Sequence, residues 1–309
     1  MNLQKSCQQI TSAHASLLQQ PGIYQLSSAL SFSVFTFAQN NPVAKKQTYR
    51  QRYNSQLINA GEAPVQQERK ERIPVDPAIQ ELYSEGKVIL VDKPLHWTSF
   101  DVVRKLRNLV QIKKIGHAGT LDPLATGLLI VCTGKFTKKI NEYMAQEKVY
   151  TGHITLGAVT PTYDLESTPE QIKDHSFVTP GLLAETTKQF TGTIEQFPPI
   201  YSAIKKDGVA LYELARRGVE VELKARTITI SSFEITEIEL PVIAFKVVCS
   251  TGTYIRSLAN DFGAALGCGA YLSSLRRTAI GNFKVEDGVD MENFEASLKQ
   301  QDMAVKKDS

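Results

Sequence analysis

Residues 116–127 read Gly116-His117-Ala118-Gly119-Thr120-Leu121-Asp122-Pro123-Leu124-Ala125-Thr126-Gly127 and form the most constrained stretch of the chain. Three glycines, an Asp-Pro pair and several small residues precede a short apolar run, which is typical of a loop that positions a side chain before a buried strand. Asp122 is the only acid in this loop, and Pro123 restricts the backbone after it by locking its own φ. Taken alone, Asp122 is read more readily as a turn residue that hydrogen-bonds nearby amides than as a functional carboxylate.

Apolar periodicity on both sides of this loop predicts a mixture of strands and helices. Thr98 or Ser99 is suited to cap a helix whose apolar face consists of Val102, Val103, Leu106, Leu109 and Val110. A second helix is expected over residues 253–266, ended by Gly267. Strands are expected at residues 87–91, 127–132, 150–156, 226–240 and 243–249. Because these elements do not alternate regularly as strand, helix and strand, the pattern favours the α+β class over a doubly wound sheet.

The charge of the chain is unevenly distributed. Of 35 Lys+Arg and 32 Asp+Glu, residues 1–75 hold 8 Lys+Arg and 3 Glu, which leaves 27 Lys+Arg and 29 Asp+Glu for the remainder. The main body would therefore bind nucleic acid through a local basic face rather than through its net charge. No apolar run reaches the ~18 residues of a membrane span, and the four cysteines lack metal-ligand spacing, so neither a membrane protein nor a metal centre is expected.

Composition and apolar periodicity divide the chain into three parts. Residues 1–78 are rich in Gln, Ser and Asn and are predicted to be a disordered extension, or the product of a start assigned too far upstream. Residues 79–290 are expected to form the folded domain, and residues 291–309 a charged tail. Within the domain, residues 196–218 mix Lys and Arg with tyrosines, which suits RNA, although a solvated charged face has a similar composition.

Four separated blocks give residues 85–290 a resemblance to a known family. The first two are Lys93-Pro94-Leu95-His96-Trp97-Thr98-Ser99 and the loop at residues 116–127. The third is Gln196-Phe197-Pro198-Pro199-Ile200-Tyr201-Ser202-Ala203-Ile204-Lys205, continuing to Gly208, Tyr212 and Arg216. The fourth is Thr251-Gly252-Thr253-Tyr254-Ile255-Arg256, followed by Leu275-Arg276-Arg277. Together they resemble the TruB family of tRNA pseudouridine-55 synthases. The resemblance implies a pseudouridine-synthase fold, with a large mixed, mainly antiparallel sheet flanked by helices and an RNA-gripping thumb at about residues 196–218.

The resemblance implies catalytic roles for Asp122, Tyr150 and Arg256. Asp122 matches the nucleophile or base of the family, and Arg256 matches an arginine that would favour the charged form of that acid. Tyr150 matches the tyrosine of a Lys-x-Tyr segment, which stacks on the target uracil and exchanges a proton. By pattern alone, Tyr150 would be a core tyrosine and Arg256 a surface residue in a solvated ion pair.

By the same resemblance, six further residues are expected to contact RNA: His117, Tyr254, Leu275, Lys93, Lys205 and Arg216. His117 is expected to pack against nucleotides displaced when the target uridine leaves its stack, a step that typically costs a few kcal/mol. A histidine satisfied by the loop backbone is the alternative. Thr160–Asp164 resembles a family element interpreted as a structural turn near the site, with Asp164 pairing a basic residue. His96 departs from the family, which has Gly there, and a Cβ would strain a turn that requires positive φ.

The implied activity is isomerisation of uridine to pseudouridine at position 55 in the T-loop of tRNA. The reaction would depend on an Asp, flip the base and require no metal or redox cofactor. The T stem-loop of tRNA is the expected partner, with no membrane and no protein partner, for a monomeric cytoplasmic enzyme. Two alternatives remain open: a guide-RNA-dependent enzyme of the dyskerin type, and a non-catalytic RNA-binding or tRNA-folding module. Dyskerin-type enzymes normally carry a C-terminal RNA-binding domain, for which the segment after residue 290 is too short.

Overall fold

A computed structural model describes residues 75–308 except 203, 207 and 220, and all of these belong to one compact unit, Val65–Ser309. Of the expected extension at residues 1–78, residues 1–74 lie outside the described residues. The helices are α2 (Pro77–Glu85), α3 (Ser99–Val110), α4 (Ile140–Ala145), α5 (Pro180–Gln189), α6 (Leu211–Arg216), α7 (Ile255–Leu266) and α8 (Met291–Asp308), with 3-10 turns η1 (Gly134–Lys139) and η2 (Val285–Asp287).

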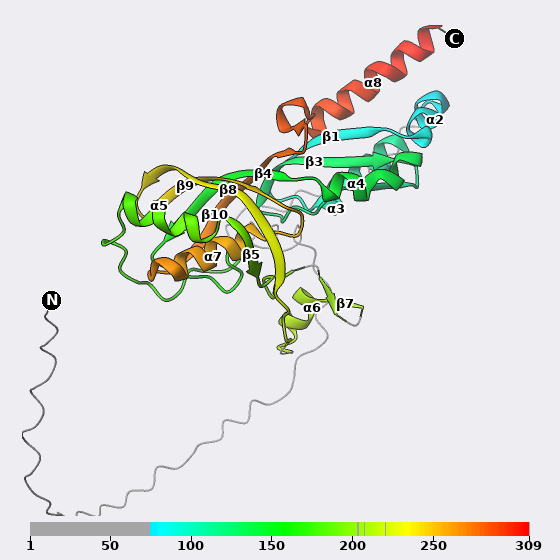
Figure 1. Cartoon of the computed structure of the whole chain (residues 1–309). Coiled ribbons are helices and arrows are strands. Elements are labelled where there is room, and N and C mark those ends of the chain that lie inside the picture. Colours follow the sequence, from blue (N-terminus) through cyan, green and yellow to red (C-terminus); the bar gives the residue numbers. More distant parts are fainter. Residues whose placement is uncertain (1–74, 203, 207, 220, 309) are drawn as a thin grey trace, which may run out of the picture. The chain divides into compact units, whose positions relative to one another are not determined.

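One nine-stranded sheet runs through the described part of the chain (Figure 1). Its order is β1 (Val88–Lys93), β3 (Ala125–Thr133), β10 (Ala270–Ile280), β4 (Lys148–Leu156), β9 (Val242–Cys249), β8 (Arg226–Glu239) and β5 (Gly192–Gln196), while β2 (Ile115–His117) pairs with β3 and β11 (Phe283–Lys284) with β10. Strands β3 and β10 run parallel, and the other pairs in the sheet are antiparallel. A separate hairpin joins β6 (Lys205–Lys206) and β7 (Val209–Ala210). The expected α+β class with a mixed, mainly antiparallel sheet is confirmed.

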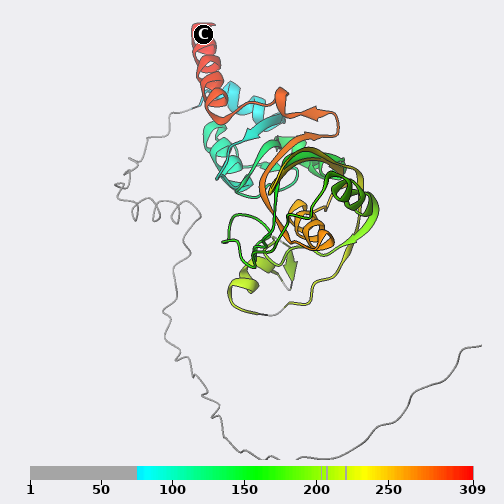
Figure 2. The ribbon, with the colours of Figure 1, turned by 90° about the vertical axis from the view of Figure 1, so that its left-hand side faces the viewer.

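Helices α3 and α7 cover the same face of the sheet, over its two halves (Figure 1, Figure 2). Alternate residues of a strand point to opposite faces. Ala125 of β3 belongs to the core beneath α7, and Leu129 and Val131, which share its parity, pack in the core with α3. The intervening Leu128 and Ile130 face the other side, toward η1, α4 and η2. The continuous sheet therefore fixes the two helices relative to each other.

Local sequence signals set the ends of these two helices. At the start of α3, Thr98 Oγ1 accepts a hydrogen bond from the Asp101 N–H (3.0 Å), and the Asp101 carboxylate accepts one from the Thr98 N–H (3.1 Å). This reciprocal capping box satisfies two amide groups that the helix itself leaves unpaired. Helix α7 ends at Gly267 with a φ of 85°, as the sequence predicts.

Strand β10 approaches both of its neighbours closely at glycines. A Cβ on Gly127 of β3 would lie 2.3 Å from the Arg277 carbonyl oxygen, and the φ of Gly127 is 99°. On the other side, a Cβ on Gly152 of β4 would lie 2.2 Å from the Ser274 carbonyl oxygen. Only glycine permits these two approaches, which hold β10 between the strands on either side of it.

Helices near the two ends of the described chain complete the core over β1 and β3. Ile79 and Tyr83 of α2 are buried in the same cluster as Met291, Phe294 and Leu298 of α8. The stretch expected as a charged tail is therefore helical, and its first turns are part of the folded unit. No helix in the described residues is long and apolar enough to cross a membrane.

Candidate active site

The loop at residues 116–127 is held by the segment that leads into α3. Ser99 Oγ accepts a hydrogen bond from the Leu121 N–H (2.8 Å) and donates one to the Leu121 carbonyl (3.2 Å). The His96 N–H donates to the Pro123 carbonyl (2.8 Å). These bonds fix the backbone on both sides of Asp122.

His96 adopts a φ of 65°, the left-handed conformation that residues other than glycine rarely adopt. The turn therefore has the positive φ expected of a position where the family has Gly. Strained residues of this kind concentrate at functional sites, where the surrounding contacts determine the backbone. Here the contact is the hydrogen bond to Pro123, next to Asp122.

Arg256, near the start of α7, lies between two carboxylates. Its Nε is 3.0 Å from Asp122 Oδ2 and 3.5 Å from Asp164 Oδ2. Its terminal nitrogens donate to the carbonyls of Thr162 (3.1 Å) and Tyr201 (3.0 Å). The Arg256 side chain is 6% exposed and that of Asp122 is 40% exposed. A guanidinium held by two main-chain carbonyls thus presents a fixed edge to a carboxylate that remains accessible to a substrate.

Asp164 is the second carboxylate on Arg256, and its side chain is 6% exposed. Burial raises the pKa of Asp164, while the charge of Arg256 and a hydrogen bond from the Glu166 N–H (3.0 Å) oppose that shift. The turn at residues 160–164 therefore supplies an acid that pairs with a basic residue of the site, as the resemblance implies.

Tyr150 on β4 is buried beside Arg277 on β10, its direct cross-strand partner. Arg277 is 1% exposed, and it donates from Nε to the Leu128 carbonyl (2.7 Å) and from a terminal nitrogen to the Gly119 carbonyl (3.1 Å). Burial raises the pKa of Tyr150, and the charge of Arg277 partly opposes this. The phenol therefore stays protonated at neutral pH and is available as a proton donor.

Two further buried cations, Lys148 and Lys93, lie near the site. Each ammonium donates to two main-chain carbonyls, those of Met144 and Gln146 for Lys148 and those of Pro94 and Trp97 for Lys93. Burial lowers the pKa of each lysine to about 8, and in both cases the positive charge of Arg277 adds to the shift. Buried cations from four elements, Arg256, Arg277, Lys148 and Lys93, therefore surround the carboxylates of the site.

A cavity of about 380 Å³ opens over these groups. Five of the predicted site residues line it: Asp122, Tyr150, Arg256, Tyr254 and Leu275. Ser202 and Ile204 of the thumb, residues 250–253 before α7, and Lys148 and Arg277 complete much of the wall. The volume lies within the range of small-ligand pockets, about 300–1,000 Å³. The three predicted catalytic residues are thus brought together with two of the predicted substrate contacts.

The other four predicted residues lie outside the lining of this cavity. Lys93 is fully buried, and His117 is half-buried at the end of β2. Burial lowers the pKa of His117, which favours its neutral imidazole. Arg216 is exposed at the end of α6, with its guanidinium 5.4 Å from the ring centre of Tyr212. Lys205 belongs to β6, and its side chain lies outside the described part of the structure.

Three residues that support the site were not singled out from sequence: Arg277, Lys148 and Gln196. Gln196 Nε2 donates to the Tyr254 carbonyl (3.1 Å), and its Oε1 accepts from the Tyr254 N–H (2.8 Å), which fixes the residue before α7. The signal was present, since Gln196 begins one matching block and Arg277 ends another. Lys148 lies two residues before Tyr150 in the Lys-x-Tyr segment.

Comparison with family models matches most of the described chain. A model of the N-terminal domain of TruB family pseudouridylate synthases matches residues 107–255, and a model of the tRNA pseudouridylate synthase B C-terminal domain matches residues 256–307. The tRNA pseudouridine synthase B of Flavobacterium johnsoniae is 56% identical over 226 residues, which are 71% of this chain and 99% of the relative. The protein of the same name from Phocaeicola vulgatus is 48% identical over 227 residues, which are 72% of this chain and 97% of the relative.

Solved structures give a consistent picture of the fold. A chain of a Cbf5-Nop10-Gar1 complex superposes with a TM-score of 0.55 at 30% identity, over 73% of this chain and 61% of that chain. A chain of an H/ACA RNP bound to a substrate RNA containing 2'-deoxyuridine superposes with a TM-score of 0.53 at 28% identity, over 75% of this chain and 60% of that chain. The present chain thus spans about three fifths of those proteins.

Proposed function

The chain belongs to the TruB family of pseudouridylate synthases, and on that premise we propose that it isomerises a uridine in the T-loop of tRNA, at position 55, with Asp122 as the catalytic carboxylate. The names of its relatives support a tRNA substrate and a uridine-isomerising enzyme. The observation that carries the assignment to Asp122 is its position in the cavity, 40% exposed and 3.0 Å from the buried Arg256.

The reaction exchanges one bond to the ribose for another. The bond from C1′ to N1 of uracil breaks, the base turns, and a bond from C1′ to C5 forms. N1 gains a proton, and C5 loses one. A carboxylate serves this sequence by removing the 2′ proton of the ribose, by attacking C1′, or by adding to C6 of the base. Each route requires an ionised Asp122 that reaches the substrate, and we take removal of the 2′ proton as the working mechanism.

Neighbouring groups supply the charge and the proton donor that this chemistry uses. Arg256 stabilises the carboxylate before it reacts, and its contacts with two carbonyls prevent it from turning away. The buried Tyr150 phenol provides a face for the uracil ring and a hydroxyl that exchanges a proton late in the reaction. Leu275 packs against the base from β10.

We take the cavity of about 380 Å³ to receive the target nucleotide alone, which requires the uridine to leave its stack. We assign His117 to the nucleotides displaced by this movement, since a neutral, half-buried imidazole suits stacking better than charge pairing. Tyr212 and Arg216 of the thumb, with Lys205, contact the RNA outside the cavity. Tyr254 contacts the substrate from the wall of the cavity. Lys93 supports the substrate site from below the loop, where its ammonium donates to the Trp97 carbonyl. The protein acts in the cytoplasm as a monomer, without a protein partner.

The test is to incubate the purified full chain with an unmodified tRNA transcript and map pseudouridine at nucleotide resolution. We expect one modified site, in the T-loop, without added RNA or protein. A transcript with cytidine at the target is the control and should yield no product. Dependence on a guide RNA would move the protein to the dyskerin type, and tight tRNA binding without product would make it a binding or folding module.

A further inference from the structure

The solvent-facing side of α3 forms a stripe that starts at the candidate site. Ser99, the first residue of the helix, is bonded to Leu121 of the catalytic loop. The next residue, Phe100, is 59% exposed, although most large apolar side chains of α3 are buried. Phe100, Arg104 and Arg107 recur at spacings of four and three residues, so they lie on one side of the helix. This side carries an aromatic ring next to the site and cations further along.

The cations of the stripe are available to an anion. The Arg104 side chain is 52% exposed and lies 2.5 Å from Asp101, whose carboxylate also caps the helix. Arg107 is partly exposed on the same side of the helix.

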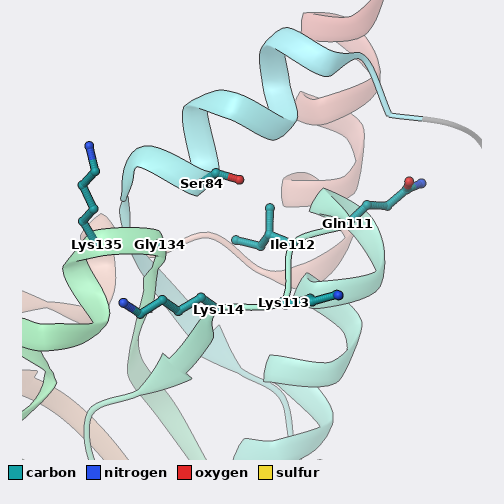
Figure 3. Close-up of a pocket in the computed structure, with 7 residues that line it drawn as sticks. All are labelled: Ser84, Gln111, Ile112, Lys113, Lys114, Gly134 and Lys135. Carbon is teal, nitrogen blue, oxygen red and sulfur yellow. The ribbon is translucent and has the colours of Figure 1, made fainter.

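Past the C-terminal end of α3, the stripe reaches a hollow of about 370 Å³ (Figure 3). We call it the lysine hollow, because exposed Lys113, Lys114 and Lys135 line it together with Gly134. Figure 3 shows Lys114 and Lys135 extending to one side and Lys113 to the other. Residues 111–140 contain five lysines and a single acid, Asp122, whereas the chain after residue 75 is nearly balanced in charge. The chain after residue 75 has almost no net charge, but this segment carries a local excess of positive charge.

We propose that this stripe, from Phe100 through Arg104 and Arg107 to the lysine hollow, binds the substrate RNA where it continues beyond the target loop. The inference rests on the proposed function, because it extends the RNA path from the cavity. Helix α3 has 12 residues and spans about 18 Å at 1.5 Å per residue. That is on the order of five nucleotide steps of ~3.4 Å. Phe100 contacts a base or ribose beside the loop, and the arginines and lysines contact successive phosphates.

A competing explanation assigns the lysines to α3 itself. Helix carbonyls carry partial negative charge at the C-terminal end, and lysines placed there stabilise the helix. The two explanations differ in what is lost on substitution. If the lysines only compensate the partial negative charge at the helix end, their substitution lowers thermal stability and leaves RNA affinity unchanged. If they bind phosphates, their substitution lowers RNA affinity and its dependence on salt.

The experiment measures KM, kcat and equilibrium binding on two RNAs, full-length tRNA and a stem-loop short enough to end before the lysine hollow. The test variants are K113Q/K114Q/K135Q and Phe100→Ala. Matched controls are K173Q/K188Q/K246Q, which removes three exposed lysines elsewhere, and Phe177→Ala, which removes a ring that is 49% exposed in the loop before α5.

We expect the lysine variant to weaken tRNA binding about tenfold or more at low salt and to reduce the slope of log affinity against log salt by about two to three. Its kinetics on the short stem-loop should match wild type. Phe100→Ala should weaken binding of both RNAs about fivefold or more without changing the salt slope, because stacking releases no counterions.

The proposal is overturned if the lysine variant binds tRNA like its control, whether or not its melting temperature changes, or if Phe100→Ala behaves like Phe177→Ala. Failure of the proposed function has a different signature, since wild-type protein would then not modify the short stem-loop at all.

Discussion

Replacing Arg256 by Met removes the cation from the candidate site while keeping a side chain of similar length. In the native protein the Arg256 Nε lies 3.0 Å from Asp122 Oδ2 and 3.5 Å from Asp164 Oδ2. The carbonyls of Thr162 and Tyr201 also lose their donors. Two carboxylates and two carbonyls then face each other without a positive charge between them.

The size of the effect follows from Coulomb's law. Unit charges 3.0 Å apart attract by about 1.4 kcal/mol at the dielectric constant of water and by about 5.5 kcal/mol at an effective value of 20. Because the Asp122 side chain is 40% exposed, a value between these limits applies, about 3 kcal/mol. If Arg256 contributes this energy in the transition state, by holding the Asp122 carboxylate in position against the substrate, its loss corresponds to a rate reduction of about 150-fold.

The assay is single-turnover formation of pseudouridine with enzyme in excess over tRNA, so that binding and product release do not limit the rate. Arg256→Lys should recover only part of the rate, because an ammonium lacks the planar donors that reach both carbonyls. Since Asp164 would be left as a buried, unpaired acid, the double variant R256M/D164N should regain thermal stability without regaining activity. A single-turnover rate for Arg256→Met within threefold of wild type, with tRNA binding intact, would refute this reasoning.

Three further predictions concern the backbone and the buried charges. His96→Val should be less stable than His96→Gly by about 1–2 kcal/mol in urea unfolding, because φ is 65° at this position; equal stabilities would contradict the strain. Gly127→Ala should lose about 3 kcal/mol or more, since its Cβ would lie 2.3 Å from the Arg277 carbonyl oxygen. Gly181→Ala, whose Cβ would lie 4.0 Å from Thr179 Oγ1, should lose little, and similar melting temperatures for the two variants would refute the close approach. Between pH 8 and 9 the free energy of unfolding should rise by about 1–2 kcal/mol. The pKa values of Lys93 and Lys148 are about 8 in the folded protein and 10.5 in the unfolded chain, so the unfolded chain binds more protons in this range. The pKa values of Cys132 and Cys249 are about 11 in the folded protein and 9.0 in the unfolded chain, so these thiols oppose the rise above pH 9. A flat profile from pH 8 to 9 would exclude these shifts.

Much of the fold was predictable because its signals are local. The capping box at Thr98, the alternation in β8 and β9, and Gly267 at the end of α7 each depend on neighbours a few residues apart. The α+β class followed from the irregular order of these elements. The parallel pairing of β3 with β10 did not follow, because it joins segments about 150 residues apart and leaves no periodic signal in either.

The site was predictable in part, for a related reason. Asp122 and Arg256 were paired through matched blocks, and the structure places them 3.0 Å apart. Burial was not predictable, since neither Lys93 nor Arg277 differs in sequence from a surface cation. Only the packing of β10 between β3 and β4 shows that Arg277 is 1% exposed and bonded to main-chain carbonyls. Gln196 likewise acquires its role from a contact with Tyr254, 58 residues away.

The most direct test of the central claim is single-turnover pseudouridine formation by Asp122→Asn, measured beside its affinity for unmodified tRNA. Asparagine keeps the size of the side chain and removes its charge, so the carboxylate chemistry is lost while the loop bonds through Leu121 and Pro123 remain. We predict no detectable pseudouridine from the variant and tRNA affinity within about threefold of wild type, a difference below 1 kcal/mol. Product formation by Asp122→Asn at a rate near that of wild type would contradict the assignment of Asp122 as the catalytic carboxylate.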